Sequence, residues 1–531
     1  MPATFTYPGI YVEEVPSGVH PITGASTSDT AFVDYFPRGP VDTATRVGSL
    51  EDYERRFGGP DRQSLASYSV RQFFLNGGQT AWIVRVIPDD TPDVATRLLT
   101  ASSPPQSTLR VDAANPGAWG SNLQVAAVQT VPANPAAFNL FVREAVPDGS
   151  GGTQIVASEV HRNLTMAVGA ASHAVAVVNA ASSLIRLSEP SGGIGQVPTL
   201  STPQASGDPP DTAWQSLSTV TDTTVYDSTS GNPVSGFPDA LQDGLSALDR
   251  IAPFRFNLLC VPAAAALAAT DAKATVDAAA AYAREKRAFL LVDPPAGLAD
   301  AAAAQAWLLG ATAPAATPNA AVYFPRVSVA DPLNPGRTRE IGASGTMAGI
   351  YARTDATRGT WKAPAGIDAT IAGGVPALNL NNDDSAVLNP LAINALRTFP
   401  VIGSVAWGAR TLFGADQRAS EWKYVPVRRM ALYIENSLVD GLGWVVFEPN
   451  DAPLHAQIRL NVGAFMQDLF RQGAFQGATP REAYLVKCDR TTTTQSDIDR
   501  GIVNILVGFA PLKPAEFVVI RIQQLAGQTQ T

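Results

Sequence analysis

One stretch of the sequence limits the possible folds more than any other, because two apolar runs of strand length flank an alanine-rich helix. The runs are residues 256–261 and 288–293, and the helix is predicted at residues 271–286. Continuous apolar runs of this length are typical of strands that are buried on both faces of a sheet. They predict a βαβ unit with two parallel strands. A second alanine-rich helix at residues 300–309 and a strand at residues 321–324 continue the pattern.

The N-terminal part of the sequence predicts a second α/β segment. We expect strands at residues 30–35 and 81–86 and helices at residues 50–57 and 65–75, because apolar residues recur there at the spacing of each element.

Residues 104–245 differ in composition from both α/β segments. Alanine, serine, threonine, proline and glycine dominate, and charged residues are sparse. Apolar residues nevertheless recur at strand spacing, for example at residues 123–131, 138–144 and 155–160, which indicates an ordered region. This composition predicts an inserted, β-rich domain at the surface.

The C-terminal region combines two amphipathic helices with short strands. Apolar residues three and four positions apart predict helices at residues 426–440 and 454–472, and Asp451 is suited to cap the second one. The apolar run at residues 444–447 predicts a short buried strand between the helices. Further strands are predicted at residues 483–488, 502–509 and 516–522.

Two predicted strands, at residues 10–15 and 516–522, lie near the ends of the sequence and are set apart by prolines. In the second, Val518, Ile520 and Ile522 alternate onto one face. Neither strand has an evident partner within its own domain. Because an unpaired strand readily pairs with another chain, both segments predict strand exchange between subunits.

Charge and cysteine content exclude several classes of protein. The chain of 531 residues has a net charge of −9 and no run of lysine or arginine, which argues against nucleic-acid binding. Cys260 and Cys488 each lie in an apolar run and are predicted to be buried free thiols, which suits assembly in a reducing cytoplasm. We find no apolar run of membrane-spanning length and no export signal, so we expect no membrane insertion.

No catalytic, cofactor-binding or metal-binding constellation is evident. The turn after the first βαβ strand, Val261-Pro262-Ala263-Ala264, lacks the glycines that cradle a phosphate, and the histidines are too scattered for metal-ligand spacing. The acidic cluster at residues 381–384 could bind a hard cation but lacks the spacing of a calcium loop. Arg353, Arg358 and Trp361 could form an anion site, although we favour a structured loop with arginine–carboxylate pairs and a buried tryptophan. We expect no catalytic residue, cofactor or metal.

Several short motifs resemble those of contractile tail sheath proteins, which occur in phage tails and phage-tail-like injection systems. The resemblance covers roughly residues 5–90 and 320–525. The N-terminal motifs are residues 7–14, 36–41, 57–59 and 76–78. The C-terminal motifs are residues 351–355, 358–366, 422–429, 433–435, 444–451, 488–489, 497–499 and 514–518.

This resemblance implies a structural subunit that polymerises as a helical lattice around an inner tube and contracts to drive the tube through a target envelope. It implies three classes of partner: further copies of the chain, the inner tube protein, and baseplate and terminator or cap proteins. It also implies assembly in the bacterial cytoplasm and incorporation into a phage tail or a phage-tail-like particle. A different hypothesis, an enzyme or a carbohydrate-binding surface protein built on the βαβ region, remains open at this point.

Patterns and resemblance together predict a mixed α/β multidomain fold with a discontinuous core, a βαβ segment, an inserted β-rich surface domain and terminal strand-exchange arms. The predicted divisions are an N-terminal arm (1–24), the first part of the core (25–103), the insertion (104–245), the βαβ segment (246–319), the C-terminal core with tube-facing helices (320–512) and a C-terminal arm (513–531).

Three sets of residues are expected to make contacts between proteins. The donated strands contain Ile10, Tyr11, Val12, Phe517, Val518, Val519, Ile520 and Ile522. The acceptor sheet is expected to contain Tyr484, Leu485, Val486, Val503, Ile505 and Val507. Polar contacts let a tube slide more easily than apolar ones, so the candidate tube contacts are cations on the free faces of the two C-terminal helices: Arg428, Arg429, Arg459 and Arg471.

Overall fold

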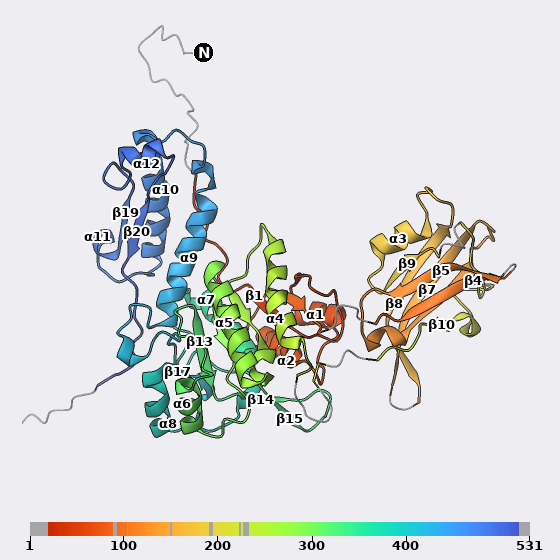
Figure 1. Ribbon diagram of the computed structural model, residues 1–531, viewed down its shortest axis with the longest axis horizontal. Coiled ribbons are helices and arrows are strands. Elements are labelled where there is room, and N and C mark those ends of the chain that lie inside the picture. The colour runs from red at the N-terminus through yellow and green to blue at the C-terminus, as the bar shows by residue number, and fades with distance from the viewer. Residues whose placement is uncertain are drawn as a thin grey trace, which may run out of the picture. The chain divides into compact units, whose positions relative to one another are not determined.

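The computed structural model describes residues 20–88, 93–102, 105–148, 151–190, 195–221, 225–226 and 233–519 (Figure 1). The chain forms two compact units. The sheet unit contains Ser28–Thr357 and Pro364–Val425, and the terminal unit contains Met1–Thr27, Arg358–Ala363 and Pro426–Thr531. The predicted strand at residues 10–15 lies outside the described residues.

The sheet unit is built on an eight-stranded sheet with the order β18-β17-β13-β12-β11-β1-β3-β2. The six central strands are parallel, and the short edge strands β2 and β18 are antiparallel to their neighbours. The predicted parallel βαβ unit is confirmed. The strands are β1 Thr30–Asp34, β2 Thr45–Val47, β3 Ala81–Arg85, β11 Leu258–Cys260, β12 Phe289–Val292, β13 Ala320–Phe324, β17 Ile393–Phe399 and β18 Gly403–Ala406.

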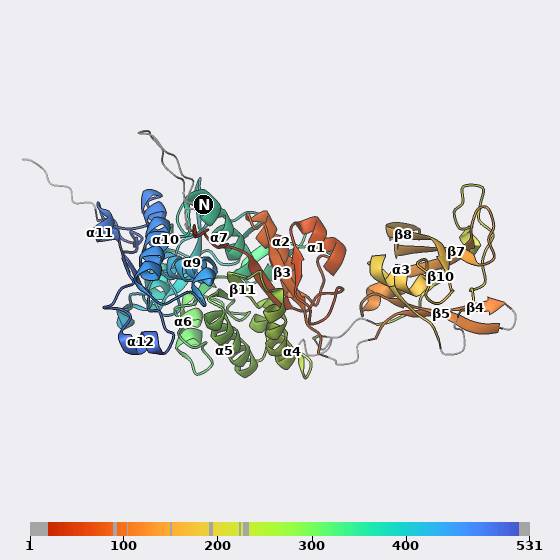
Figure 2. The same cartoon turned by 90° about the horizontal axis from the view of Figure 1, so that it is seen from above.

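Helices cover both faces of this sheet, which is why its central strands are apolar throughout. In Figure 2, α1, α2 and α7 lie on one side of the sheet and α4, α5 and α6 on the other. Small residues such as Ala279 and Ala283 let α5 approach the strands closely, and both are fully buried. The bounds are α1 Leu50–Phe57, α2 Leu65–Leu75, α4 Phe237–Gly244, α5 Ala269–Glu285, α6 Ala301–Leu309, α7 Ser344–Arg358 and α8 Asn382–Leu388.

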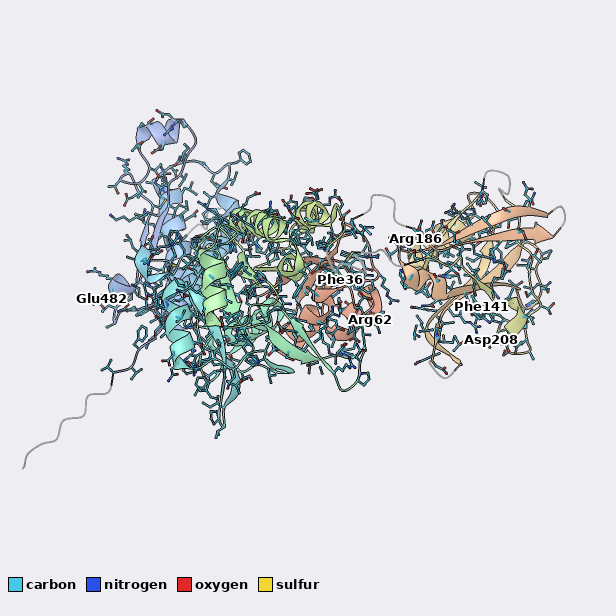
Figure 3. The ribbon with its side chains drawn as sticks, turned by 60° about the horizontal axis from the view of Figure 1, so that its bottom comes forward. Phe36, Arg62, Phe141, Arg186, Asp208 and Glu482 are labelled. Atoms are coloured by element: carbon cyan, nitrogen blue, oxygen red, sulfur yellow. The ribbon has the colours of Figure 1, made fainter. Side chains whose placement is uncertain are left out.

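A β-rich insertion, residues 93–221, interrupts the sheet unit between β3 and β11. It contains a three-stranded sheet, β4-β5-β9, and a four-stranded sheet, β10-β6-β7-β8, with a separate apolar core that includes Leu109, Val125 and Leu140. Phe141, labelled in Figure 3, belongs to a small second cluster with Ala126 and Val128. The elements are β4 Thr96–Ser102, β5 Pro105–Ala113, β6 Leu123–Gln129, β7 Ala137–Pro147, β8 Thr153–Thr165, α3 Ala174–Ala181, β9 Ile185–Ser188 and β10 Gln215–Ser216.

The predicted limits of the insertion, residues 104 and 245, need correction at both ends. Strand β4 already belongs to the insertion and precedes residue 104. Phe237 and Leu241 of α4, in contrast, pack in the core of the main sheet. Composition does not mark the second boundary, because residues 222–236 are as rich in serine and threonine as the insertion itself.

A small antiparallel sheet, β15-β14-β16, completes the sheet unit. Its strands are β14 Val327–Ala330, β15 Thr338–Ile341 and β16 Gly374–Pro376.

The terminal unit packs two long helices against a two-stranded sheet. Met430 and Ile434 of α9 meet Ile458 and Phe465 of α10 in one apolar core, which also includes Phe475. Asp451 accepts a hydrogen bond from the amide of Leu454 at 3.0 Å, so the predicted N-cap of α10 is confirmed. The elements are α9 Val425–Gly441, α10 Ala452–Arg471, α11 Pro480–Ala483, β19 Tyr484–Lys487, α12 Gln495–Asp499 and β20 Leu506–Phe509.

Two predictions for local structure are wrong. Residues 444–447 do not form a buried strand; Gly443–Val445 is a short 3₁₀ helix, and Val446 and Phe447 are exposed. An apolar run of four residues fits a strand or a loop equally well, because it is too short to show a period. The stretch 351–366 is also not one loop, since α7 continues to Arg358.

Candidate functional site

The two-stranded sheet of the terminal unit is the predicted strand acceptor. Strands β19 and β20 pair in antiparallel register from Tyr484 with Phe509 to Lys487 with Leu506. Of the predicted acceptor residues, Tyr484, Leu485, Val486 and Val507 lie in these strands. Val503 and Ile505 precede β20 but pack against the same core. The predicted pairing of the two segments is therefore confirmed, with a shorter second strand.

This sheet has few strands and one exposed face. Tyr484, Val486 and Val507 pack partly against α10, whereas Leu485 and Leu506 are exposed on the strands. A two-stranded sheet is marginally stable on its own and gains stability from packing or from additional strands. Among the described residues, β19 and β20 pair as strands only with each other. The arrangement thus leaves room for further strand pairing.

The C-terminal segment of the chain follows β20 and exposes apolar side chains. Phe517, Val518 and Val519 are all largely exposed, and residues 512–519 contain no strand. Ile520 and Ile522 lie outside the described residues. An apolar segment without a strand partner among the described residues is the state expected of a donor strand before it pairs. Its pairing with another subunit stays a prediction.

The N-terminal segment is attached to α9 at its described end. His20 stacks on Trp444 with ring centroids 4.5 Å apart, and the amide of Ala25 donates to Ser437 Oγ at 3.0 Å. Gly24 lies so close to Tyr433 that a Cβ would be 2.1 Å from the tyrosine hydroxyl. These contacts fix the end of the predicted N-terminal arm. Ile10, Tyr11 and Val12 lie outside the described residues, so their predicted strand exchange is not tested.

The four candidate tube contacts differ in exposure. Arg471 is open to solvent, with 72% of its side chain exposed, and pairs loosely with Asp468 at 3.6 Å. Arg428 is half-buried and pairs with Glu435 at 3.3 Å. Arg459 is half-buried and donates to the carbonyl of Cys488. All three have side chains that are at least partly accessible.

The prediction that Arg429 lies on a free helix face is wrong. Its side chain is only 4% exposed, and Nη2 donates to the carbonyl of Thr27 at 2.8 Å. This arginine therefore holds the N-terminal segment within its own unit. Helical spacing alone did not reveal this, because the partner lies about 400 positions away in the sequence.

The stretch 351–366 makes structural contacts. Arg353 donates to the carbonyl of Thr370 at 2.7 Å, so the predicted carboxylate partner is replaced by a backbone oxygen. Trp361 packs against the core of the terminal unit, as predicted. Thr360 donates to Met430 Sδ at 3.6 Å in the same place.

The main sheet has the topology of ligand-binding α/β folds, so its switch point is the place to seek an enzyme site. The chain places β3 on one side of β1 and β11 on the other, and ligands of such folds bind beyond the carboxyl ends of these strands. Here Asp34, the last residue of β1, occupies this position. Its carboxylate accepts hydrogen bonds from the amides of Tyr35 at 2.6 Å and Ala263 at 2.8 Å.

Asp34 is fully enclosed, and burial raises its pKa to about 8. A second carboxylate, Asp293, follows β12 and accepts from the amide of Ser344 at 2.8 Å and from its hydroxyl at 2.6 Å. Burial also raises the pKa of Asp293. Asp293 thus occupies the N-terminus of α7, and Asp34 accepts from an amide of the short 3₁₀ helix Pro262–Ala266, so these backbone donors are already used by the chain's own side chains. Sequence reasoning missed both residues, although Asp34 is the last residue of an apolar strand and Asp293 directly follows one.

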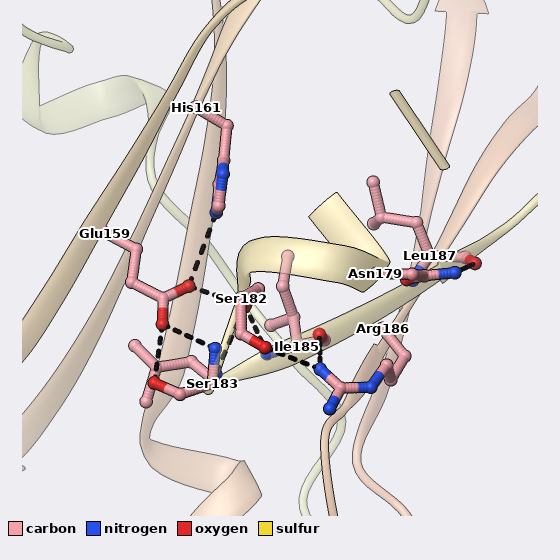
Figure 4. Close-up of polar contacts among 9 residues, drawn as sticks. Glu159, His161, Asn179, Ser182, Ser183, Ile185, Arg186 and Leu187 are labelled. Atoms are coloured by element: carbon pink, nitrogen blue, oxygen red, sulfur yellow. Dashed lines mark hydrogen bonds and ion pairs between the residues drawn. The ribbon is translucent and has the colours of Figure 1, made fainter. Parts of the chain in front are cut away.

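Another polar cluster, in the insertion, contains the residue types of a catalytic triad (Figure 4). Glu159 accepts hydrogen bonds from Ser182 Oγ at 2.5 Å and from the amide and hydroxyl of Ser183 at 2.8 and 2.7 Å. His161 Nε2 lies 3.3 Å from the same carboxylate. In a triad the histidine would contact the serine, whereas here both contact the glutamate. The hydrogen bonds lower the pKa of Glu159 despite burial, and the cluster joins β8 to the turn before β9.

The acidic cluster at residues 381–384 is a helix cap. Asn381 accepts from the amides of Asp383 and Asp384, and Asp384 accepts from the amide of Asn381, which forms a capping box at the start of α8. In the described ranges, no group of three or more histidine, cysteine, aspartate or glutamate side chains is arranged to hold a metal ion. Cys260 and Cys488 are buried free thiols, as predicted. None of the helices described has both the length and the apolarity needed to cross a membrane.

Comparisons with known proteins show similarity to tail sheath proteins. A model of the phage tail sheath C-terminal domain matches residues 417–524, which include α9, α10 and the two-stranded sheet. The tail sheath protein of Vibrio phage KVP40 is 26% identical over 186 residues, 35% of this chain and 26% of that protein. The C-terminal part of the chain therefore matches the tail sheath proteins. A putative prophage major tail sheath protein of Pseudomonas aeruginosa is 27% identical over 246 residues, 45% of this chain.

These sequence matches span 26% and 59% of the lengths of the two relatives, less than two thirds in each case. The fold is shared more widely. The sheath of an extracellular contractile injection system, PVC, in the contracted state covers 99% of both chains at 22% identity and a TM-score of 0.57. The sheath tail protein Lin1278 from Listeria innocua covers 92% of this chain and 96% of its own, at 14% identity and a TM-score of 0.59. The proteins that the chain resembles are sheath proteins, which disfavours the hypothesis of an enzyme built on the βαβ region.

Proposed function

We propose that the chain is the structural subunit of a contractile sheath, which polymerises as a helical lattice around an inner tube and contracts to drive that tube through a target envelope. The observation that carries the proposal is the C-terminal segment, which extends from the acceptor sheet with apolar side chains exposed. The similarity to sheath proteins along nearly the whole chain supports it. A subunit of this kind works by changing its packing, so it needs no catalytic residue or cofactor.

Strand exchange would tether the subunits. We propose that residues 516–522 of one copy pair with the sheet formed by β19 and β20 of a neighbour, together with residues 10–15 of another copy. Each backbone hydrogen bond gained would contribute about 0.5–1.5 kcal/mol. Burial of Val518, Ile520 and Ile522 would add about 1.5–3 kcal/mol for each side chain before ordering costs. Linkers between the exchanged strands and the units would absorb the motion of contraction.

The inner tube, baseplate and cap proteins are proposed as further partners, with assembly in the bacterial cytoplasm and incorporation into a phage tail or phage-tail-like particle. Arg471 is the best candidate for a tube contact, because it is exposed near the end of α10. Arg428 and Arg459 follow as weaker candidates, since each already has a partner. Polar contacts of this kind hold a tube in a salt-dependent manner and release it easily.

A truncation after Lys513 tests the proposal. The shortened chain should fold with the wild-type melting temperature but remain monomeric in sedimentation, because it lacks the donor strand. A matched control that removes only residues 526–531 should still form tubes visible by negative-stain electron microscopy, since residues 516–522 remain. A truncated chain that still polymerises, or one that no longer folds, contradicts strand donation.

The insertion is proposed to lie on the outside of the sheath and not to hold the lattice. Its separate core, which includes Leu109 and Leu140, supports this division. Replacing residues 93–221 with a short glycine–serine linker should leave tube formation intact. A folded variant that forms no polymer would refute this placement.

A further inference from the structure

The β-rich insertion and the main sheet have separate apolar cores. The core of the insertion includes Leu109 and Leu140, that of the main sheet includes Val84 and Leu259, and among the described residues no side chain belongs to both. Apolar burial therefore keeps each part folded but does not attach one to the other. The attachment is polar. We call it the joint, and it connects residues 37–39 and 85, next to the main sheet, with residues 116–119 and 144 of the insertion.

One half of the joint is the guanidinium group of Arg85, the last residue of β3. The side chain is fully buried, and its Nη1 donates to the carbonyls of Gly39 and Pro116, both at 2.9 Å. Its Nη2 donates to the carbonyl of Pro37 at 3.3 Å. Gly39 and Pro37 belong to the turn after β1, whereas Pro116 belongs to the insertion. A single buried cation thus binds backbone oxygens on both sides of the joint.

The other half of the joint is an ion pair between Arg38 and Glu144. Nη1 of Arg38 lies 3.0 Å from Oε2 of Glu144 on β7, and the two side chains are only 14% and 7% exposed. The guanidinium carbon of Arg38 also lies 5.4 Å from the ring centroid of Trp119 in the insertion. Without Arg38, the closed joint would hold a buried carboxylate that has lost its ion-pair partner, which is unfavourable compared with a carboxylate in water.

The two backbones also approach each other closely at Gly117. This residue has φ +124°, and a Cβ there would lie 2.7 Å from the carbonyl oxygen of Pro37. The joint is therefore tightly packed, yet its strength comes from hydrogen bonds and charges. Such groups regain hydrogen bonds with water when they separate, so a polar contact between folded parts opens more easily than an apolar one.

We propose that Arg38 and Arg85 form a latch, which holds the insertion in the described position and opens to release it as a rigid body. The core of the insertion keeps it folded in both states. Opening hydrates Glu144 and the two guanidinium groups together, so the latch has a closed and an open state with no stable intermediate position. This inference goes beyond the proposed function and does not require it. In a contracting lattice, the same latch would let the insertions move aside as copies come closer.

Distances between two spin labels test the latch in the full-length chain. Val168→Cys in the insertion and Leu309→Cys at the end of α6 provide exposed labelling sites, while Cys260 and Cys488 are buried. Labelled chains are diluted with unlabelled ones, so that electron–electron resonance reports distances within one copy, whether or not the chain polymerises. The chain that carries only the label sites should show one dominant distance.

Arg38→Met should raise the ratio of open to closed chains about hundredfold, because the closed state then buries an unpaired carboxylate. Arg38→Met combined with Glu144→Gln should return part of the way to the closed distance, because the buried charge is gone. Arg110→Ala, which removes an exposed arginine paired within the insertion to Asp112, is the matched control and should change nothing. An unchanged distance in Arg38→Met, or loss of the melting transition of the insertion, would overturn the latch.

A pair of glycine variants tests the joint without changing a charge. Gly117→Ala should populate the open distance, because its Cβ would collide with the carbonyl of Pro37. Gly169→Ala is the control: Gly169 also lies in the insertion and has a positive φ of +79°, but its Cβ would meet no atom within 4 Å. Both variants carry similar backbone strain, so only the contact across the joint distinguishes them. Equal distance distributions in the two variants would refute the close packing on which the latch depends.

Discussion

Raising the pH should weaken the main sheet through the ionisation of Asp34. Its folded-state pKa of about 8 lies above the ordinary value of 3.8, so the folded chain keeps a proton that the unfolded chain loses. The stabilisation is complete below the ordinary pKa and is lost as the pH rises through the pKa of the folded chain. The free energy of unfolding should therefore fall progressively between about pH 4 and pH 8.

The magnitude follows from the difference between the two pKa values. One pKa unit corresponds to about 1.4 kcal/mol, so a shift of about four units corresponds to a loss of about 6 kcal/mol across the whole range. This is a substantial fraction of the stability of a typical domain, about 5–15 kcal/mol. Each pH unit within the range should increase the population of the open sheet about tenfold.

Labelling of the two buried cysteines measures this effect separately in each unit. Cys260 lies on β11 and pairs in register with Phe32 of β1, so it becomes reactive only when the strands around Asp34 separate. Cys488 lies in the terminal unit and reports on that unit. Labelling rates are divided by the rates of the unfolded chain at each pH, which removes the intrinsic pH dependence of thiols. The corrected rate at Cys260 should rise about tenfold per pH unit, and that at Cys488 should not follow it.

Asp34→Asn is the decisive variant, because asparagine retains one acceptor oxygen and cannot ionise. It should lower the protection of Cys260 at pH 5 but remove most of its pH dependence. Asp293 remains in the variant, so the difference between the two chains isolates the contribution of Asp34. A variant with an unchanged pH slope would show that Asp34 does not hold the proton.

Three further substitutions test other parts of the structure. Asn461→Leu should stabilise the terminal unit by about 1–3 kcal/mol, because Asn461 is 2% exposed and neither polar atom of its side chain has a hydrogen-bond partner among the described residues. Slower labelling of Cys488 would verify this stabilisation, and faster labelling would contradict it. Gly24→Ala should detach the N-terminal segment from Tyr433, seen as faster amide hydrogen exchange at Ala25, and unchanged exchange would refute the close packing. Glu159→Gln should destabilise the insertion by about 2 kcal/mol at neutral pH, measured by the rate at which the insertion is proteolysed. Because the pKa of Glu159 is lowered, the wild-type insertion should lose the same stabilisation as the pH falls below about 4.5. Equal proteolysis of both chains at pH 7 would contradict the role of Glu159.

Elements with a full period of apolar residues could be predicted from the sequence. Helices α1, α2, α6 and α10 and the parallel strands β11 and β12 lie within a few residues of their predicted positions, because long apolar stripes and buried runs depend on neighbouring residues. The run at residues 444–447 is too short for such an argument. The conformation of these residues depends on tertiary context; Phe447, for example, adopts φ +71° and is exposed to solvent.

Contacts between distant parts of the chain could not be predicted. The sequence pattern around Arg429 is that of an exposed helical arginine, and only the structure shows that its side chain donates to the carbonyl of Thr27. Asp34 and Asp293 carried a usable signal, since each is a charged residue at the end of an apolar run that predicts a strand. The pairing partners of the terminal strands belong to other molecules in the proposed assembly, so one sequence indicates only that such partners are needed.

The edges of the main sheet would protect the chain at the very high local concentration of the proposed assembly. At one edge, β2 has only three residues and carries the charged Arg46. At the other, residues 366–371 run beside β18, where the amide of Ile371 donates to the carbonyl of Ser404 at 2.8 Å. Short, charged or covered edges prevent sheets of adjacent molecules from merging into amyloid-like stacks. In the proposed assembly, such edges would direct crowded copies of this chain away from uncontrolled aggregation while they are being ordered into a regular array.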